Sequence, residues 1–198
     1  CGGVMRVAPI GIYAAAHPDR LSAVEAGSLA AQAAEITHRH PSSSLASALA
    51  AMLVAELATT DIRNISDLVG IIIACLDSTL RAVPCDDKIS AEFKRLILDT
   101  ARLAMEVTPE EDAIRRIGEG WVGDEAIAIA LYAVMRHFDD FGACIVTAVN
   151  HDGDSDSTAA IAGNILGALR GFSAIPRHYI DGLEMTDILE STARKLVD

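Results

Sequence analysis

The chain has 198 residues, of which 51% are hydrophobic and only 4% aromatic, and its formal net charge is −12. This length fits one domain with a substantial core, and a composition rich in Ala, Ile and Leu favours helices packed on helices. We therefore expect an all-α fold, and the acidic charge argues against a direct nucleic-acid footprint, which requires basic residues.

The cysteines and the apolar runs give expectations about the protein's surroundings. The 4 cysteines show neither CxxC spacing nor a nearby histidine pair, so the sequence indicates neither a zinc site nor a disulfide framework. The longest apolar runs, such as residues 68–76, are too short to cross a bilayer. We expect a cytoplasmic protein without membrane contact.

The first residues, CGGVMRVAPIG, contain neither an initiating Met nor a helix cap. This start predicts that residues 1–198 are the C-terminal portion of a single domain whose N-terminal segment is missing from the sequence. The adjacent Gly2 and Gly3 could bring backbone N–H groups close to an anion, as in phosphate-binding loops, or could form an ordinary turn. The apolar segment that follows is expected to end at Pro9.

The first predicted helix covers residues 18–37 and ends in the letters THRHP. Pro41 disfavours helical geometry at His40, so the helix should end before that residue. No third nitrogen or thiolate ligand accompanies the two histidines, which argues against a metal site there. We expect His38 to be a polar pocket residue and His40 to lie on the surface.

Hydrophobic periodicity predicts most of the remaining helices. Ser42–Ser44 are interpreted as a cap cluster before a largely buried helix, and Asp86–Asp87 as acids at a helix start. The expected helices cover residues 45–57, 65–80, 87–106, 121–135, 138–149 and 186–197.

A short helix is expected between Thr108 and Gly118. Thr108 would be its cap, Pro109 would occupy the first helical position, and Glu111 would complete a capping box. Trp121, the single tryptophan, leads the next helix and is interpreted as a core anchor.

Residues 151–169, with the letters HDGDSDSTAAIAGNILGAL, are predicted to form a polar loop that leads into a helix. Asp156 or Ser157 could cap this helix, but capping needs one oxygen ligand, and residues 154–158 hold two carboxylates and three hydroxyls. A hard cation such as Mg²⁺ or Mn²⁺ would explain the surplus. Two interpretations stay open from the spacing alone: a well-capped helix with a solvated acidic start, or a metal site.

Three further features of this stretch bear on its geometry. In an extended loop, Asp154 and Asp156 would point to the same side and could face one ion. Gly153 would allow the backbone to turn sharply just before them. The helix that follows has one face of small residues, where a neighbouring helix could approach closely: Ala160, Gly163 and Gly167.

Several of these segments occur together and in this order in one known family, and the sequence resembles the ADP-ribosylglycohydrolases. The strongest match is GDSDSTAAIAGNILGALRG at residues 153–171, which follows the family's Gly-Asp-Thr/Ser-Asp-Thr/Ser signature and its small-residue helix. Residues 60–115 carry little of the resemblance. Further matching segments lie at residues 2–6, 37–38, 118–132, 175–176 and 186–189.

The resemblance implies an all-helical hydrolase with two divalent cations, Mg²⁺ or Mn²⁺. It would cleave the glycosidic bond between ADP-ribose and a modified side chain or small acceptor, so its partner would be an ADP-ribosylated protein or a small ADP-ribosyl substrate. The family's metal ligands fall on Asp154, Asp156 and Ser157, where the serine replaces a common threonine and keeps a hydroxyl oxygen.

The resemblance also implies a nucleotide pocket, and Cys1 falls where some members have Asn. The family's other metal ligands and its catalytic acid lie upstream of the Met-Arg segment, so we expect them before residue 1. This chain is then predicted to hold half of a catalytic centre, because two near-octahedral ions need about a dozen donors. The substrate-binding residues of the family correspond to Gly2, Gly3, His38, Glu119 and Trp121.

In the implied reaction, paired ions orient the ribose hydroxyls and position a water that attacks the anomeric carbon, while carboxylates stabilise an oxocarbenium-like state. Two alternatives stay open. One is a non-catalytic relative that binds ADP-ribose or another nucleotide. The other is a metal-dependent hydrolase of a different ribosyl compound.

Overall fold

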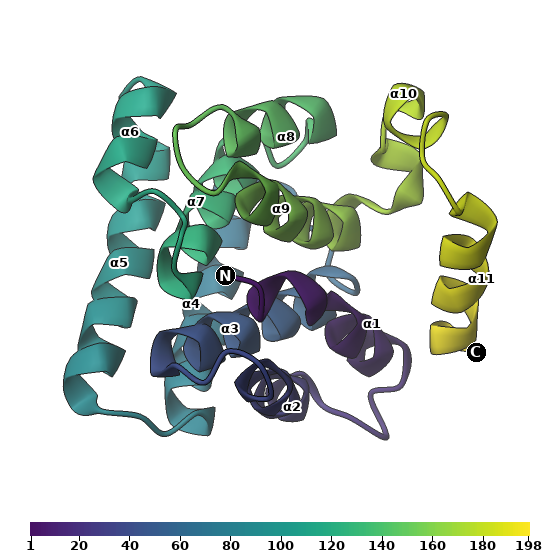
Figure 1. Cartoon of the computed structure of the whole chain (residues 1–198), viewed down its shortest axis with the longest axis horizontal. Helices are drawn as coiled ribbons and strands as arrows, with labels where there is room; N and C mark the ends of the chain where they lie inside the picture. Colours follow the sequence, from purple (N-terminus) through teal and green to yellow (C-terminus); the bar gives the residue numbers. More distant parts are fainter.

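A computed structural model describes all 198 residues, and every regular element in it is helical, which confirms the expected all-α fold (Figure 1). The elements, with η for a 3-10 helix, are η1 (Val4–Arg6), α1 (Ala8–Ala16), α2 (Ala23–Glu35), α3 (Pro41–Leu57), α4 (Ile65–Ala82), α5 (Asp87–Met105), α6 (Glu110–Ile117), α7 (Gly123–Arg136), α8 (Phe141–Val149), α9 (Ser155–Arg170), η2 (Phe172–Ala174), α10 (Arg177–Ile180) and α11 (Thr186–Val197).

Two helices, α3 and α7, form the centre of the core. Residues 42–55 of α3 and residues 126–135 of α7 are all buried, since these stretches contain no charged side chain. Both helices pack against α9, and η1 packs against α3 and α9. The N-terminus therefore lies between α9 and α3, as Figure 1 shows.

The longest periodic segments are predicted well. The helices expected at residues 45–57, 65–80 and 87–106 correspond to α3, α4 and α5, and the last expected helix is α11. Asp86 is confirmed as a helix-start acid, because its carboxylate accepts a hydrogen bond from the backbone N–H of Lys88 at 2.9 Å.

The N-terminal region differs from the prediction in two helices. Residues 8–16 form α1 where only a short apolar segment ending at Pro9 was expected. Proline is tolerated there because an N–H group in the first helical turn has no partner within the helix. Helix α2 begins at Ala23 and not at residue 18, because Ser22 and Glu25 form a capping box.

The serine cluster before α3 does not cap the helix, which corrects the prediction. Ser42–Ser44 lie inside the first turns of α3 and are buried. The cap is His40, whose backbone is extended, as Pro41 predicts, and whose Nδ1 accepts a hydrogen bond from the backbone N–H of Ser42 at 3.3 Å. His40 is exposed, which confirms its expected surface position.

The capping box expected from Thr108 and Glu111 is also wrong. Pro109 has an extended backbone with ψ 137°, so the helix begins one residue later at Glu110 and no side chain caps it. The end of this helix is predicted correctly, because Gly118 terminates α6 with φ +149°, a value that favours glycine.

Two expectations about α8 and α9 need correction. The helix predicted from residue 138 begins at Phe141, because Asp140 caps it through a hydrogen bond to the N–H of Ala143. The small-residue face of α9 receives no close helix. A Cβ added at Gly167 would meet nothing within 4 Å, and one added at Gly163 would make only an ordinary contact.

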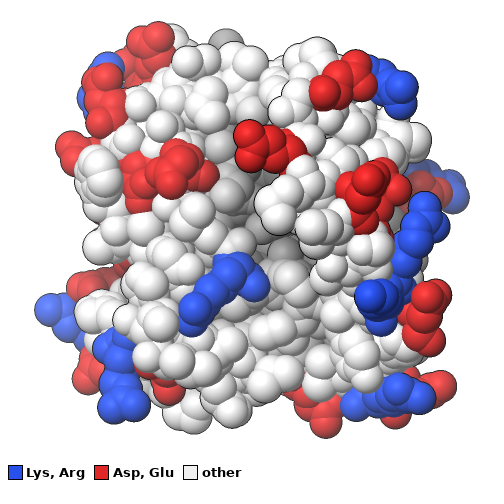
Figure 2. Space-filling view, turned by 45° about the vertical axis from the view of Figure 1, so that its right-hand side comes forward, with Lys and Arg blue, Asp and Glu red and all other residues white.

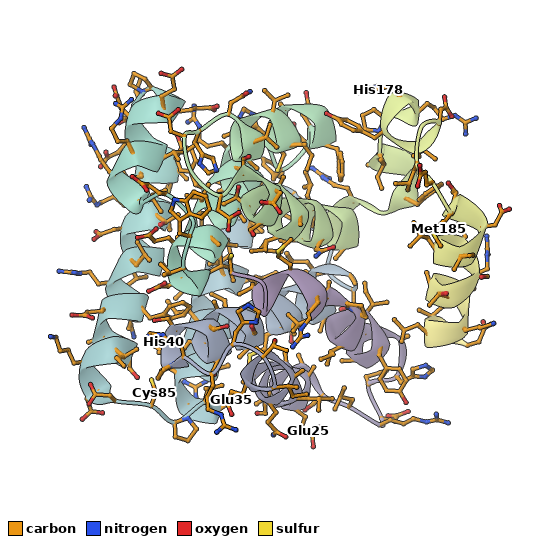
Figure 3. The ribbon with its side chains drawn as sticks, in the orientation of Figure 1. Glu25, Glu35, His40, Cys85, His178 and Met185 are labelled. Carbon is orange, nitrogen blue, oxygen red and sulfur yellow. The ribbon has the colours of Figure 1, made fainter.

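The C-terminal segment, residues 171–198, contains no buried residue. Within it, α11 packs against α1, and Figure 3 labels His178 and Met185 on this outer segment. Acidic and basic side chains are interspersed over the face drawn in Figure 2, and the basic ones form no continuous stripe there. None of the helices combines the length and the apolar character that crossing a membrane requires.

Candidate functional site

The start of α9 is arranged differently from an ordinary capped helix. Asp154 is the N-cap residue, yet neither its side chain nor that of Asp156 or Ser157 makes a capping hydrogen bond, so the expected capping role is wrong. The Asp154 carboxylate turns instead toward the N-terminus, where Oδ2 accepts a hydrogen bond from the Cys1 thiol at 2.7 Å. The side-chain oxygens of Asp154, Asp156 and Ser157 therefore do not cap the helix.

The three expected metal ligands differ in burial. Asp154 is only 9% exposed and Ser157 only 2%, whereas Asp156 is exposed in the first turn of α9. The expectation that the two carboxylates share one side of an extended loop is wrong, because residues from 155 onward are already helical. Asp154 and Ser157, three residues apart, are the buried members of the set.

Residues 1–6, which include η1, are attached to α9 by side-chain contacts. Besides the Cys1 contact, the Ser157 hydroxyl donates to Sδ of Met5 at 3.2 Å. The Asn164 amide donates to the carbonyl oxygen of Met5 at 3.2 Å. Residues 1–6, the glycine segment, and residues 154–158, the acidic helix start, are far apart in the sequence. They therefore form one local structure through these contacts.

The loop before α7 is the second neighbour of the acidic start. The backbone N–H of Asp154 donates to the carbonyl of Glu119 at 2.8 Å. The loop itself is organised by Glu125, whose Oε2 accepts hydrogen bonds from the N–H groups of Glu119 and Gly120, both at 3.1 Å. Glu119 is thus held against Asp154, the first residue of the acidic helix start.

Trp121 lies on the same loop and not in the core, which corrects the core-anchor interpretation. The residue is 61% exposed and precedes α7. Its Nε1–H donates to Oε2 of Glu119 at 3.2 Å, which orients the indole at the surface of the loop. The ring is available to stack against a planar ligand.

His38 lies directly against the glycine segment. A Cβ added at Gly2 would be 2.8 Å from Nε2 of His38, so glycine is what lets the ring approach the backbone. The Arg6 guanidinium donates to Thr37 Oγ1, and this oxygen lies 2.8 Å from Nδ1 of His38. With Arg6 as its donor, the Thr37 hydroxyl can donate to Nδ1, which leaves the N–H of His38 on Nε2 beside Gly2.

The structure thus joins most of the predicted site residues through Cys1 and Asp154. On one side lies the glycine segment with His38, and on the other lies the loop with Glu119 and Trp121. Gly3 belongs to this group by sequence but is buried against Ser43 and Ala34. His38 is exposed, and it does not line the polar pocket between α6 and the loop from α8 to α9.

Sequence reasoning missed the contacts of three residues that hold this arrangement together: Cys1, Met5 and Glu125. The two sulfur-containing side chains gave no local signal, because their contacts span 153 and 152 residues. Glu125 could have been found from the glycine-rich loop that precedes it, since such a loop needs an acceptor for its free N–H groups.

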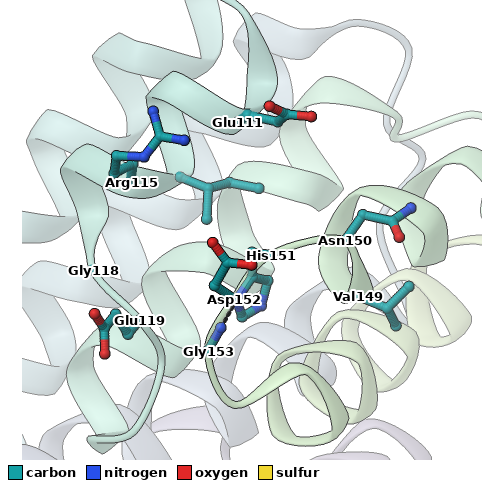
Figure 4. A pocket seen from close by; sticks show the side chains of 10 residues that line it. Glu111, Arg115, Gly118, Glu119, Val149, Asn150, His151, Asp152 and Gly153 are labelled. Carbon is teal, nitrogen blue, oxygen red and sulfur yellow. Dashed lines mark hydrogen bonds between the residues drawn. The ribbon is translucent and has the colours of Figure 1, made fainter.

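A polar pocket of about 560 Å³ adjoins this arrangement on the far side of Gly153 (Figure 4). It lies between α6 and the loop from α8 to α9. His151 in its wall accepts from the N–H of Gly153 at 3.1 Å and contacts Thr158 Oγ1 at 2.9 Å. Its polar lining includes Glu111, Arg115, Glu119, Asn150 and Asp152.

No three His, Cys, Asp or Glu side chains of the chain are grouped as a metal site. The donor chemistry of the α9 start nevertheless fits a hard cation. Asp154 is a buried carboxylate whose only side-chain partner is a neutral thiol, and it forms no ion pair. A buried charge without a counter-charge is costly, and carboxylate and hydroxyl oxygens are the ligands that Mg²⁺ and Mn²⁺ prefer.

The fold and the site together define an all-α protein with an acidic helix start bound to a glycine segment. The chain belongs to the ADP-ribosylglycohydrolase family, because the model of that family matches residues 1–198. This finding confirms the resemblance noted in the sequence.

Individual relatives match the chain over different lengths, and two of the following three are named as ADP-ribosyl hydrolases. The chain is 32% identical over 200 residues to an uncharacterized protein of Archaeoglobus fulgidus, a match that covers 100% of this chain and 58% of that protein. It is 37% identical over 87 residues to the ADP-ribosylarginine hydrolase Tri1 of Serratia proteamaculans, covering 44% of this chain and 23% of the relative. The mouse ADP-ribosylhydrolase ARH3 is 24% identical over 107 residues, which cover 48% of this chain and 29% of the relative.

The chain therefore spans a little over half the length of the Archaeoglobus protein and less than a third of the other two relatives. No solved structure matches it.

Proposed function

We propose that this chain contributes to a site that hydrolyses the glycosidic bond of an ADP-ribosyl group. The observation that carries the proposal is the buried Asp154 carboxylate, which has no basic partner and is joined through Cys1 to the glycine segment. In this proposal Asp154, Asp156 and Ser157 are ligands of Mg²⁺ or Mn²⁺. Such an ion, when bound, would act as a Lewis acid on the ribose hydroxyls and on the water that attacks the anomeric carbon.

The surrounding residues have separate roles in binding. The backbone of Gly2 would face the diphosphate, with the Nε2–H of His38 as an additional donor beside it, whereas Gly3 is buried and supports this backbone from behind. The indole of Trp121 offers an exposed aromatic face to the nucleotide, and Glu119 holds the indole in orientation. Carboxylates near the anomeric carbon would favour the oxocarbenium-like character that develops there.

The substrate in this proposal is an ADP-ribosylated protein side chain or a small ADP-ribosyl compound. Support comes from the relatives, since the Serratia protein is named an ADP-ribosylarginine hydrolase and the mouse protein an ADP-ribosylhydrolase. Which linkage is cut is decided by experiment, with substrates carrying ADP-ribose on arginine, on serine and on nucleic acid.

The test compares the full chain with single variants for release of free ADP-ribose in the presence of Mn²⁺ or Mg²⁺. Asp154→Ala and Asp156→Ala are expected to abolish release without unfolding the protein. Asp152→Ala is the matched control, because Asp152 is an exposed carboxylate of the same loop and makes no hydrogen bond. Undiminished release by both the Asp154 and Asp156 variants would refute the assignment, and ADP-ribose binding without any release would support a non-catalytic relative.

A further inference from the structure

Two sulfur atoms of residues 1–6 contact the two buried oxygen ligands proposed at the start of α9. The Cys1 thiol donates to Asp154 at 2.7 Å, and Met5 Sδ accepts from the Ser157 hydroxyl at 3.2 Å. We propose that Cys1 and Met5 are positioning residues, which orient the oxygen atoms of Asp154 and Ser157 for a divalent cation. This inference rests on the cation site of the proposed function.

The contact between Met5 and Ser157 determines where the hydroxyl proton goes. A hydroxyl that binds a cation must present an oxygen lone pair to the ion, so its proton needs an acceptor elsewhere. Ser157 is only 2% exposed, which leaves little access for a water to serve as that acceptor. The Met5 thioether takes this role, and because the hydroxyl donates to it, the lone pairs of the oxygen stay available for an ion.

The contact between Cys1 and Asp154 determines the rotation of the carboxylate. The thiol donates to Oδ2 alone, so it fixes the plane of the carboxylate and leaves Oδ1 without a protein partner. A thiol is a neutral donor, and therefore it orients the group without cancelling its charge. An Arg or Lys at this position would neutralise the carboxylate and weaken its attraction for a cation.

The backbone that carries both sulfur atoms is held in place by the core. Val4 is buried, and its N–H donates to the Cys1 carbonyl at 2.8 Å. The Asn164 amide of α9 donates to the Met5 carbonyl at 3.2 Å. The sulfur atoms are thus supported by the same helix whose first turn they orient, as a positioning role requires.

The experiment is a calorimetric titration of the full chain with Mn²⁺ alone, repeated on variants. Met5→Leu keeps the volume of the side chain and removes the acceptor, and Cys1→Ala removes the donor. Cys1→Ser restores an O–H donor. Met135→Leu is the matched control, because Met135 is equally apolar, is buried in α7 and makes no hydrogen bond.

We expect Met5→Leu and Cys1→Ala each to weaken Mn²⁺ affinity about tenfold, the lower end of the effect known for residues that support metal ligands. Cys1→Ser should recover most of the loss, and Met135→Leu should bind as the unmodified chain does. A purely structural role would lower the melting temperature without Mn²⁺ and leave affinity unchanged. That melting temperature is therefore measured for every variant.

The outcomes separate this inference from the proposed function. If the unmodified chain binds Mn²⁺ and both Met5→Leu and Cys1→Ala bind it equally well, the positioning role of Cys1 and Met5 is overturned. The cation site of the proposed function is not affected by that result. A loss in only one variant supports that residue and overturns the role of the other. If the unmodified chain takes up no Mn²⁺, the cation site and the positioning role both fall.

Discussion

Gly153 and Glu119 approach each other so closely that no side chain fits at position 153. A Cβ added to Gly153 would lie 1.7 Å from the carbonyl oxygen of Glu119, far inside any permitted contact. The same oxygen accepts the hydrogen bond from the N–H of Asp154 at 2.8 Å. The glycine is required for this close approach, and the approach sets where Asp154 enters α9. The chain also bends at residues 151–153, where the sequence predicts a sharp turn.

Replacing Gly153 tests this relationship. Gly153→Ala should destabilise the protein by about 1–3 kcal/mol, because the clashing atom is backbone and cannot rotate away. Gly167→Ala is the control, since a Cβ there meets open space inside a helix, and it should stabilise by about 0.5–1 kcal/mol. Urea denaturation of the two variants measures both changes. Equal stability of the two variants would contradict the close approach.

The second prediction concerns the carboxylate of Glu110, which joins α6 to α7 and α8. It accepts hydrogen bonds from Thr147 at 2.7 Å and from Nε2 of His137 at 2.8 Å, and Arg136 lies 3.6 Å away. Partial burial alone would raise the pKa of Glu110, but the Thr147 hydroxyl, His137 and Arg136 outweigh it and lower the pKa below its ordinary 4.5. The folded state therefore favours the charged form.

A lowered pKa in the folded state gives stability that is present above pH 4.5 and is lost as pH falls through the lowered value. Glu110→Gln should therefore be less stable than the unmodified chain near neutral pH, and the difference should shrink at acid pH, where Glu110 is protonated. Unfolding free energies measured across this range test it. Glu111→Gln, at an exposed neighbour, should show no such trend. A difference independent of pH would argue against the ion pair.

These results show which parts of the structure follow from local sequence. Helices α4 and α5 are long and periodic, so the apolar spacing identified them within a few residues. Helix α1 was missed because its nine residues are apolar on nearly all faces and contain Pro9, so neither periodicity nor a cap marks it. Trp121 was misplaced because a large aromatic residue ordinarily indicates a core, and burial depends on tertiary neighbours.

The candidate site, too, could be predicted from the sequence only in part. Asp154 and Asp156 stood out because an oxygen-rich cluster exceeds what capping needs, and the resemblance to the family, indicated by the order of the motifs, added Ser157 as a ligand. The contacts of Cys1 and Met5 could not be predicted, because sulfur-containing residues usually serve packing and these pair with groups more than 150 residues away. Long-range pairing of this kind is decided by how α9 packs on η1.

The third prediction concerns the reactivity of the four cysteines, all of which are free thiols. Burial raises the pKa of Cys75 and of Cys144 to about 12, and a nearby carboxylate adds to each shift. Cys1 and Cys85 are only partly buried. Because the thiolate is the reactive form, a disulfide reagent at pH 8 should label Cys85 fastest in the folded protein. Cys1 should react more slowly, because its thiol donates to the carboxylate of Asp154, and the other two should react only after denaturation. Mass spectrometry identifies the labelled sites, and simultaneous labelling of all of them would contradict the burial.

The last prediction uses Trp121 as both probe and binding residue. Because it is the single tryptophan and is exposed, its fluorescence in the free protein should resemble that of the unfolded chain and should change when ADP-ribose is added. Stacking of a base on an aromatic side chain is worth about 1–3 kcal/mol, so Trp121→Ala should weaken ADP-ribose binding about 5- to 150-fold. Trp121→Phe keeps an aromatic face and should lose less affinity for ADP-ribose.

Phe172→Ala is the control, since Phe172 is equally exposed at 61% but lies beyond the C-terminal end of α9. Unchanged affinity in Trp121→Ala would remove this loop from the nucleotide site while leaving the metal ligands untouched.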